Sequence, residues 1–351
     1  MRGRSAGRNR DQAPHERRKI GHAAAGLRLG WRLARIVSRL IVAAERLQVF
    51  RALQGKLRAA DAIEKSLGIH SYYLRPFLAA LVSLGLLSKT GDGYSNTAFA
   101  GKYFVRERSI YWTQQSSAEC AEQYEALCLL EKALAPGKRY ESVNGRKRRT
   151  YTEEMKRNER QAEDFTQMLF HLHQGDAAAL AGYLDLSGHG AVLDVCGGSG
   201  VMSIALAKRN PYLLARILDI APVCKIAAAN VKRSGLSRRI ATAAGDARRP
   251  YPAGYDVVLF CDIGPVKPRH LRNAYRSLSP GSLVVLADRY FTDDGTKPLD
   301  RLASFFTHAG FGLATRREMV DAVRSCGFDK VRARPVFEDV WCITGIKPAS
   351  R

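Results

Sequence analysis

The sequence lacks the marks of several protein classes. No run of eighteen apolar residues occurs, so no segment is typical of a membrane-spanning helix. The basic N-terminus has neither the apolar stretch nor the cleavage site of a secretory signal peptide. The seven cysteines form no C-x-x-C pair, which disfavours a disulfide framework and a bound metal. We therefore predict a cytoplasmic protein, because free cysteines are typical of a reducing compartment.

Acidic residues are also scarce, since 33 Asp and Glu oppose 56 Lys and Arg and leave a net charge of +23. Residues 1–40 carry +9 of this excess, because eleven basic residues there face two acidic ones. We predict that residues 1–26 form a disordered basic arm. Solvation is the simplest interpretation of the arm, and contact with nucleic acid or an anionic membrane is the alternative.

The chain has 351 residues, of which 46% are hydrophobic, and can bury the cores of two domains. Its N-terminal part, residues 27–108, follows the element order of a winged helix. Three helical segments and a hairpin are predicted, over residues 27–53, 59–67, 71–84 and 86–96. Ser71 is the predicted cap of the third helical segment. Residues 109–188 are predicted to form a helical connector, interrupted by a basic surface loop at Gly145–Arg149.

From residue 189 to residue 351 the pattern changes to short apolar strands that alternate with helices. The predicted strands are 191–196, 215–220, 239–244, 255–261, 282–288, 329–334 and 339–345. The predicted helices are 200–209, 222–234, 267–278, 298–308 and 315–326. This alternation predicts an α/β fold with a Rossmann-like, seven-stranded, mostly parallel sheet.

A glycine-rich turn follows the first of these strands, in the run Val192-Leu193-Asp194-Val195-Cys196-Gly197-Gly198-Ser199-Gly200. Glycines let the backbone approach a ligand closely, and the helix that follows offers free N–H groups. Asp219 closes the second strand, where a carboxylate can accept hydrogen bonds from a ribose. Gly245-Asp246 follows the third strand, at the edge where open sheets bind ligands.

Two ligand classes compete for this turn. A dinucleotide prefers G-x-G-x-x-G/A, but Ser203 occupies the third position of that pattern. Asp194 would also lie near a pyrophosphate, whereas it can face the amino group of a phosphate-free ligand. S-adenosylmethionine is such a ligand, and we predict it as the cofactor.

With these residues, the C-terminal half resembles class I S-adenosylmethionine-dependent methyltransferases. From about residue 40 the chain is similar to the small-molecule O-methyltransferase family that includes acetylserotonin, caffeate and hydroxyneurosporene O-methyltransferases. Asp219–Val223 resembles the family's Asp-Leu-Pro-x-Val, and Gly245-Asp246 resembles its Gly-Asp. In the N-terminal part the resemblance rests on Leu78–Leu87. It implies a homodimer built through the winged-helix-like domain, and residues 109–188 that face the substrate.

The resemblance also implies roles at individual positions. Cys196, Gly198 and Gly200 would line the methionine end of the cofactor, and Cys196 replaces a glycine of the family motif. Asp219 would hold the ribose. The complete predicted cofactor set is Asp194, Cys196, Gly197, Gly198, Gly200, Asp219, Asp246, Ala247 and Cys261, with Asp246 and Ala247 at the adenine.

The chain departs from the family at the catalytic base. The family places a His-Asp pair after the fourth strand, but here that segment is Cys261–Val266 and holds no histidine. The candidate polar groups for catalysis are Asp262 at the strand end and His171 and His173 on the substrate-facing helix. Without a base, positioning alone can still supply about 7–11 kcal/mol.

The predicted function is methyl transfer from S-adenosylmethionine to a small, hydrophobic or aromatic acceptor, with oxygen as the expected target. Carbon or nitrogen methylation is the first alternative. The second is a winged-helix regulator that senses S-adenosylmethionine without catalysis. Nucleic-acid binding is disfavoured, because residues 70–84 contain Arg75 as their only long basic side chain. Peripheral membrane contact through the apolar face of residues 27–50 stays open.

Overall fold

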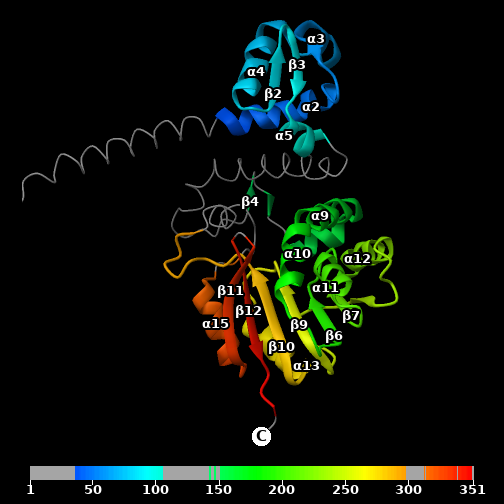
Figure 1. Ribbon diagram of the computed structural model, residues 1–351, viewed down its shortest axis with the longest axis vertical. Coiled ribbons are helices and arrows are strands. Elements are labelled where there is room, and N and C mark those ends of the chain that lie inside the picture. The colour runs from blue at the N-terminus through cyan, green and yellow to red at the C-terminus, as the bar shows by residue number, and fades with distance from the viewer. Residues whose placement is uncertain are drawn as a thin grey trace, which may run out of the picture. The chain divides into compact units, whose positions relative to one another are not determined.

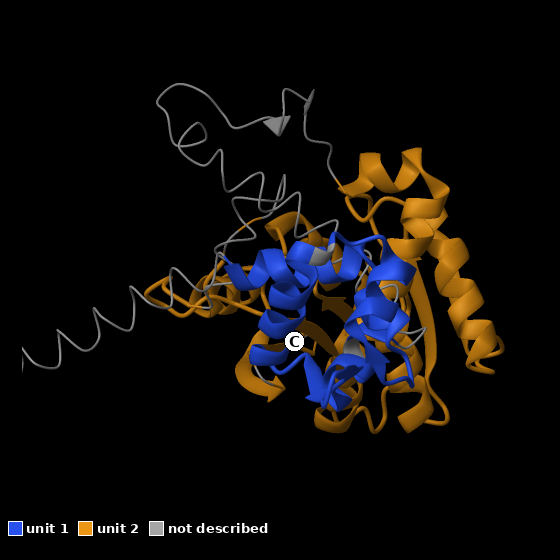
Figure 2. Ribbon diagram, turned by 90° about the horizontal axis from the view of Figure 1, so that it is seen from above, with its two compact units in different colours: residues 1–117 blue, residues 118–351 orange. Residues whose placement is uncertain are grey.

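The computed structural model describes residues 36–105, the strand segments 142–143 and 146–147, and residues 151–297, 312, 314–337 and 339–349. The chain divides into two compact units, residues 1–117 and 118–351 (Figure 2). The predicted arm 1–26 and the predicted helix 298–308 lie outside the described residues. In the described part of the chain, no helix has the length and apolarity needed to cross a bilayer.

The first unit has the winged-helix order that the sequence predicts. Residues 36–46 are helical. The elements that follow are α2 (Val49–Ala52), β1 (Arg58–Ala59), α3 (Ala60–Leu67), α4 (Ser71–Ser83), β2 (Leu87–Thr90), β3 (Gly93–Asn96), α5 (Ala98–Ala100) and a π-helical turn, η1 (Gly101–Val105). The hairpin β2–β3 is confirmed, and β1 adds a third strand that sequence analysis missed. Phe50, Leu74 and Leu78 lie in the buried core of this unit.

The helical pattern over 27–53 predicts one amphipathic helix or a pair of helices. The described part forms a pair, because the helix breaks at Gln48, whose φ of 58° is left-handed. One local prediction in this unit needs correction. The N-terminus of α4 is capped by His70 and not by Ser71, because the His70 ring accepts a hydrogen bond from the Tyr72 N–H at 3.2 Å.

The second unit begins with the short antiparallel pair β4 (Ser142–Val143) and β5 (Arg146–Lys147), so part of the predicted basic loop is a strand. Three helices follow: α8 (Tyr151–Arg157), α9 (Glu159–Leu172) and α10 (Gln174–Tyr183). They pack against the sheet domain, α9 on α12 and α10 on α11 (Figure 1). The predicted connector is therefore part of the same unit as the sheet.

The sheet contains seven strands, as predicted. They are β6 (Ala191–Val195), β7 (Leu214–Asp219), β8 (Ile240–Ala244), β9 (Tyr255–Cys261), β10 (Leu278–Asp288), β11 (Asp329–Phe337) and β12 (Val340–Ile346). Their order is β11-β12-β10-β9-β6-β7-β8, and β12 runs antiparallel to both of its neighbours. The order reverses beside β6, which places the glycine turn at the switch point where open sheets bind ligands.

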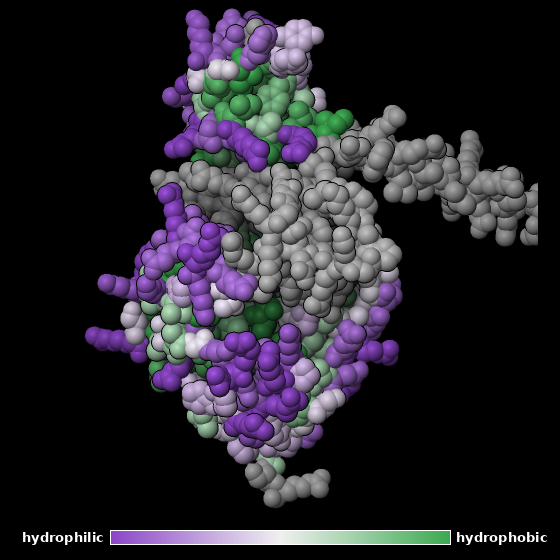
Figure 3. Space-filling view, turned by 180° about the vertical axis from the view of Figure 1, so that it is seen from behind, coloured by the Kyte–Doolittle hydropathy of each residue, from purple (hydrophilic) through white to green (hydrophobic). Residues whose placement is uncertain are grey.

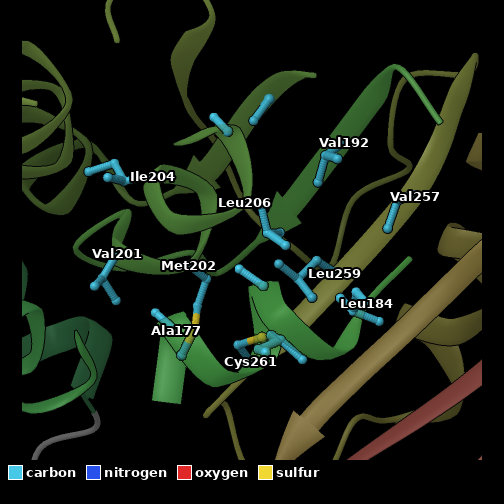
Figure 4. Close-up of a cluster of buried hydrophobic side chains, with 14 of the residues drawn as sticks. Ala177, Leu184, Val192, Val201, Met202, Ile204, Leu206, Val257, Leu259 and Cys261 are labelled. Atoms are coloured by element: carbon cyan, nitrogen blue, oxygen red, sulfur yellow. The ribbon is translucent and has the colours of Figure 1, made fainter. Parts of the chain in front are cut away.

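Helices cover both faces of the sheet. They are α11 (Val201–Arg209), α12 (Ala221–Arg233), α13 (Pro268–Ser277) and α15 (Arg316–Ser325), in addition to α8–α10. Alternate residues of β6 and β9 point to opposite faces of the sheet. Val192 and Leu259 pack with α10 and α11 (Figure 4). Leu193 and Phe260 pack with α13 and α15 on the other face. This alternation follows from the two-residue period of a strand. The carboxyl ends of β6, β7 and β9 lie side by side, because these strands pair in parallel.

Candidate functional site

The glycine turn joins β6 to α11 and is held in an unusual backbone conformation. Cys196, Gly198 and Gly200 all have left-handed φ values, of 56°, 54° and 79°. A Cβ at Gly197 would lie 2.6 Å from Cγ of Asp194, and one at Gly200 would lie 2.8 Å from Cδ1 of Ile217. Glycine is therefore required at both positions by close packing beneath the turn.

Asp194 lies under this turn and is completely buried. Its Oδ2 accepts a hydrogen bond from the Ser203 hydroxyl at 2.6 Å, while Oδ1 has no hydrogen-bond partner among the described residues. Burial, followed by the nearby charge of Asp219, raises the pKa of Asp194 to about 6. Asp194 thus supports the turn from beneath. Its predicted role, to face the amino group of the ligand through ordered water or neighbouring backbone, stays a prediction.

Asp219 ends β7, the strand beside β6, as predicted. Its Oδ2 accepts a hydrogen bond from the Gly198 N–H at 2.9 Å, and its Oδ1 accepts one from the Ile220 N–H at 2.7 Å. Burial raises the pKa of this carboxyl. The structure therefore brings the acidic residue into direct contact with the glycine turn, and each carboxylate oxygen keeps a further lone pair for a ligand.

Asp246 and Ala247 follow β8 at the same edge. The Arg248 guanidinium binds both oxygens of Asp246, with Nε 2.8 Å from Oδ1 and an Nη 2.6 Å from Oδ2. This pairing lowers the pKa of Asp246. The Ala247 carbonyl accepts a hydrogen bond from the Tyr251 hydroxyl at 2.9 Å. An adenine that docks here would share Asp246 with Arg248, a partner that the sequence analysis did not consider.

The two predicted cofactor-binding cysteines lie in different surroundings. Cys196 is half-buried within the turn, and burial followed by the charge of Asp219 raises the pKa of its thiol to about 12. Cys261 packs in the apolar core between the sheet and α10–α11 (Figure 4), where burial raises its pKa well above the usual value. Cys261 therefore belongs to the core and not to the surface of the site, because odd-numbered residues at the end of β9 face that core.

The structure joins two of the three catalytic candidates. His173 is buried between α9 and α10, and its Nε2 lies 3.0 Å from Oδ2 of Asp262, directly after β9. Its Nδ1 lies 2.7 Å from Oδ2 of Asp176, in the first turn of α10. Arg289, directly after β10, reaches the same Asp176 oxygen at 3.4 Å. Four polar side chains from three parts of the chain thus form one continuous row.

His171, the third catalytic candidate, lies in the last turn of α9. It lies two positions before His173 on α9, so the two side chains point to different faces of the helix. The His171 ring packs edge-on against Phe170, with 5.5 Å between the ring centroids. The structure therefore separates His171 from the two candidates that it brings together.

Sequence analysis missed several residues of the site. The spacing His173-x-x-Asp176 is a usable signal for the dyad, because residues three apart share a helix face. Asn230 donates a hydrogen bond to the Ser199 carbonyl of the turn at 2.9 Å and accepts one from Gln167 of α9 at 2.9 Å. Tyr151, whose pKa is raised by burial and then by the charges of Asp219 and Cys196, begins α8. No local pattern points to Asn230 or Tyr151.

These features fit S-adenosylmethionine. Gly197 and Gly198 carry no side chains, so the backbone of the turn can approach a ligand closely. The carboxylates of Asp219 and Asp246 lie at the same edge of the sheet, which favours a cationic, phosphate-free molecule. Among the described residues no cluster of His, Cys, Asp and Glu is arranged to hold a metal ion.

Comparison with known proteins gives a consistent result. A family model described as an O-methyltransferase domain matches residues 129–316. The 3-hydroxy-5-methyl-1-naphthoate 3-O-methyltransferase of Streptomyces sahachiroi is 29% identical over 296 residues, covering 81% of this chain and 84% of that protein.

Two further similarities differ in extent. The L-tyrosine C(3)-methyltransferase of Streptomyces lavendulae is 38% identical, but only over 122 residues, 33% of either chain. The solved structure of human N-acetylserotonin methyltransferase with SAM superposes with a TM-score of 0.75 at 19% identity, covering 98% of this chain and all of that one. At that identity the superposition establishes the fold.

Proposed function

Because the chain belongs to the O-methyltransferase domain family and is an S-adenosylmethionine-dependent methyltransferase, we propose that it methylates an oxygen atom of a small, largely apolar or aromatic acceptor. When bound, the cofactor supplies an electrophilic methyl group on a sulfonium. The observation that carries the choice of oxygen is the row of His173, Asp176 and Asp262 beside the glycine turn, because a hydroxyl nucleophile must lose a proton. A relative's named activity on a hydroxynaphthoate supports the same class of acceptor.

The cofactor roles follow from the geometry of the turn. We assign the methionine end to the backbone of Cys196, Gly197, Gly198 and Gly200, because the close packing at Gly197 and Gly200 keeps this turn free of larger side chains. Asp219 would accept from the ribose hydroxyls, because it already fixes the turn through Gly198.

Two rival functions are weighed by specific observations. Carbon methylation is supported by the partial similarity to a tyrosine C-methyltransferase. A DNA-binding role is disfavoured, because the Arg75 guanidinium on α4 is paired with Asp61 at 3.2 Å and the neighbouring exposed side chains are Tyr72 and Tyr73.

A homodimer and a cytoplasmic location stay predictions. The dimer is supported by large hydrophobic side chains that are exposed on the first unit, Ile36, Leu47, Leu57 and Phe99, and hydrophobic surface is visible there in Figure 3. Such surface is often covered by a second subunit.

The test is methyl transfer from methyl-labelled S-adenosylmethionine to a panel of 3-hydroxy-5-methyl-1-naphthoate, catechol and L-tyrosine. Label in a methyl ether, located by NMR, supports the proposal. Label on a ring carbon of tyrosine alone would overturn the choice of oxygen, and calorimetry without S-adenosylmethionine binding would overturn the site.

A further inference from the structure

The row Arg289–Asp176–His173–Asp262 is buried at its centre and partly exposed to solvent at both ends. The side chains of His173 and Asp176 are 7% and 8% exposed, whereas those of Asp262 and Arg289 are 29% and 24% exposed. The buried centre is thus an imidazole whose two nitrogens both face carboxylates. Asp262 is the more open of these two carboxylates and the one that an acceptor can reach.

The backbone places Asp262 beside the cofactor site. Parallel pairing of β6 with β9 aligns Asp194 with Leu259, and continuing this register brings Gly197 level with Asp262. Neighbouring strands lie about 4.8 Å apart, so the residue after β9 emerges next to the glycine turn. Asp262 has a left-handed φ of 49°, which turns the chain away from the strand at this point.

The helix dipoles act on the charges of the row. His173 is both the C-cap of α9 and the N-cap of α10, so the two helix dipoles act on its ring with opposite sign. Asp176 lies in the first turn of α10, where the positive end of the dipole stabilises a carboxylate. Arg289 offsets the charge of Asp176 from the end of β10. The groups that act on the His173 ring are therefore Asp176 from α10 and Asp262 after β9, with Arg289 acting through Asp176.

We propose that this row removes the proton of the acceptor: Asp262 contacts the hydroxyl and relays its proton to Nε2 of His173, while Asp176 and Arg289 are positioning residues that orient the ring. Asp176 holds the proton on Nδ1, so the basic nitrogen of neutral His173 is the one that faces Asp262. The base comes from the α9–α10 junction, and it replaces the histidine that is missing from the segment after β9.

The step balances within the site. The acceptor oxygen forms its bond to the methyl carbon as the C–S bond breaks, and the electron pair of that bond stays on sulfur. The hydroxyl proton passes to Asp262 and then to Nε2 of His173, which becomes an imidazolium. The part-exposed Asp262 returns the proton to solvent after the product leaves.

The row also sets the pH dependence. Burial lowers the pKa of His173, but the hydrogen bond to Asp176 and the close carboxylate of Asp262 outweigh it and raise the pKa to about 9. The relay needs neutral His173, so the rate should rise with pH up to that value. Removing the Asp176 charge should lower the pKa of His173. The rise of the rate with pH should then occur about one pH unit or more toward acid. Removing this charge should also lower the maximal rate about tenfold or more, because the ring loses its orientation.

This inference rests on the proposed function, and its test separates the two. NMR titration of histidine-labelled full-length protein gives the pKa of His173, assigned with His173→Gln. The variants are Asp176→Asn, Asp176→Glu as the conservative rescue, and Glu163→Gln as a matched control that neutralises an exposed carboxylate on α9. Rates are measured across pH with 3-hydroxy-5-methyl-1-naphthoate and catechol, and cofactor binding by calorimetry.

We expect a raised His173 pKa in the parent protein and in Glu163→Gln, and a lower His173 pKa in Asp176→Asn. The cofactor affinity of both variants should equal that of the parent protein. The combined variant His173→Gln/Asp262→Asn should lose no more rate than either single variant, because the two residues act as one unit. A His173 pKa that Asp176→Asn leaves unchanged, or a rise of the rate with pH that does not follow this pKa, would overturn the inference. Absence of methylation with both acceptors counts against the proposed function, and the NMR result then decides this inference alone.

Discussion

At the scale of single residues, the site depends on buried residues that hold the glycine turn in place. Asp219 fixes the glycine turn through the Gly198 N–H, and the same carboxylate is expected to hold the ribose. Gly197 lies so close to Asp194 that no side chain fits. Each of the two residues has a matched control position near the amino-terminal end of a strand of the same sheet.

Replacing Asp219 with alanine should weaken S-adenosylmethionine binding by about 100- to 10,000-fold, because two ribose hydroxyls lose a charged acceptor and each such hydrogen bond contributes about 1.5–3 kcal/mol. Calorimetry measures the loss. Asp256→Ala is the control, since Asp256 also accepts two backbone N–H groups, those of Gly190 and Ala191 at 2.8 Å, but at the far edge of β6. Equal losses of affinity in the two variants would contradict the assignment.

Replacing Gly197 with alanine should lower the free energy of unfolding by about 1–3 kcal/mol, the usual cost of overpacking a core. The new Cβ would lie 2.6 Å from the buried Asp194 carboxyl. Gly190→Ala is the control: Gly190 precedes β6, and its nearest atom would be 3.7 Å away. Urea unfolding compares the two, and a Gly197→Ala variant as stable as Gly190→Ala would show that the turn adjusts freely.

At the scale of elements, α12 links α9, the helix that is predicted to face the substrate, to the glycine turn. Asn230 is 1% exposed and bonds both Gln167 of α9 and the Ser199 carbonyl. The arrangement makes the position of the turn depend on how α9 packs. This link and the row at His173 both connect the helical segment to the sheet edge that carries the glycine turn.

Asn230→Ala should leave the Ser199 carbonyl and the Gln167 amide without this buried partner. Each unsatisfied buried group costs about 1–3 kcal/mol, so both unfolding stability and cofactor affinity should fall. Asn210→Ala is the control, because Asn210 bonds the Leu206 carbonyl at 2.9 Å at the end of α11 that is remote from the turn. Loss of stability in both variants with loss of affinity in neither would argue against a role for Asn230 in the turn.

At the scale of the whole molecule, the first unit owes its stability to residues near the start of the described chain. Ala44, Val49, Phe50 and Leu53 are 0–2% exposed in its core. The unit still presents exposed hydrophobic side chains, which fits a subunit interface. The predicted basic arm contributes charge and little apolar area.

Deleting residues 1–26 should therefore leave the predicted dimer intact, because the arm adds little apolar area to bury. Deleting residues 1–53 should expose the core around Leu74 and Leu78 and cause aggregation. Light scattering coupled to size-exclusion chromatography distinguishes the two outcomes. A stable monomer from the longer deletion would contradict the prediction.

The sequence by itself determined the sheet, the glycine turn and the acidic residues at the strand ends. Periodicity and glycine spacing are local, and parallel strands must place their carboxyl ends at one edge, so Asp219 and Asp246 could be located without coordinates. The family resemblance supplied the cofactor for the same reason, because its motifs are short and contiguous.

Only the tertiary structure decided which side chains meet. His173 and Asp262 are far apart in the chain and were separate candidates until the packing of α9 and α10 against β9 joined them, together with Asp176 and Arg289. The sequence did not show that Asp194 and Cys261 are buried, because burial depends on which helices cover each face of the sheet. The partners of a side chain and its burial depend on contacts between distant segments of the chain, so no local sequence pattern predicts them.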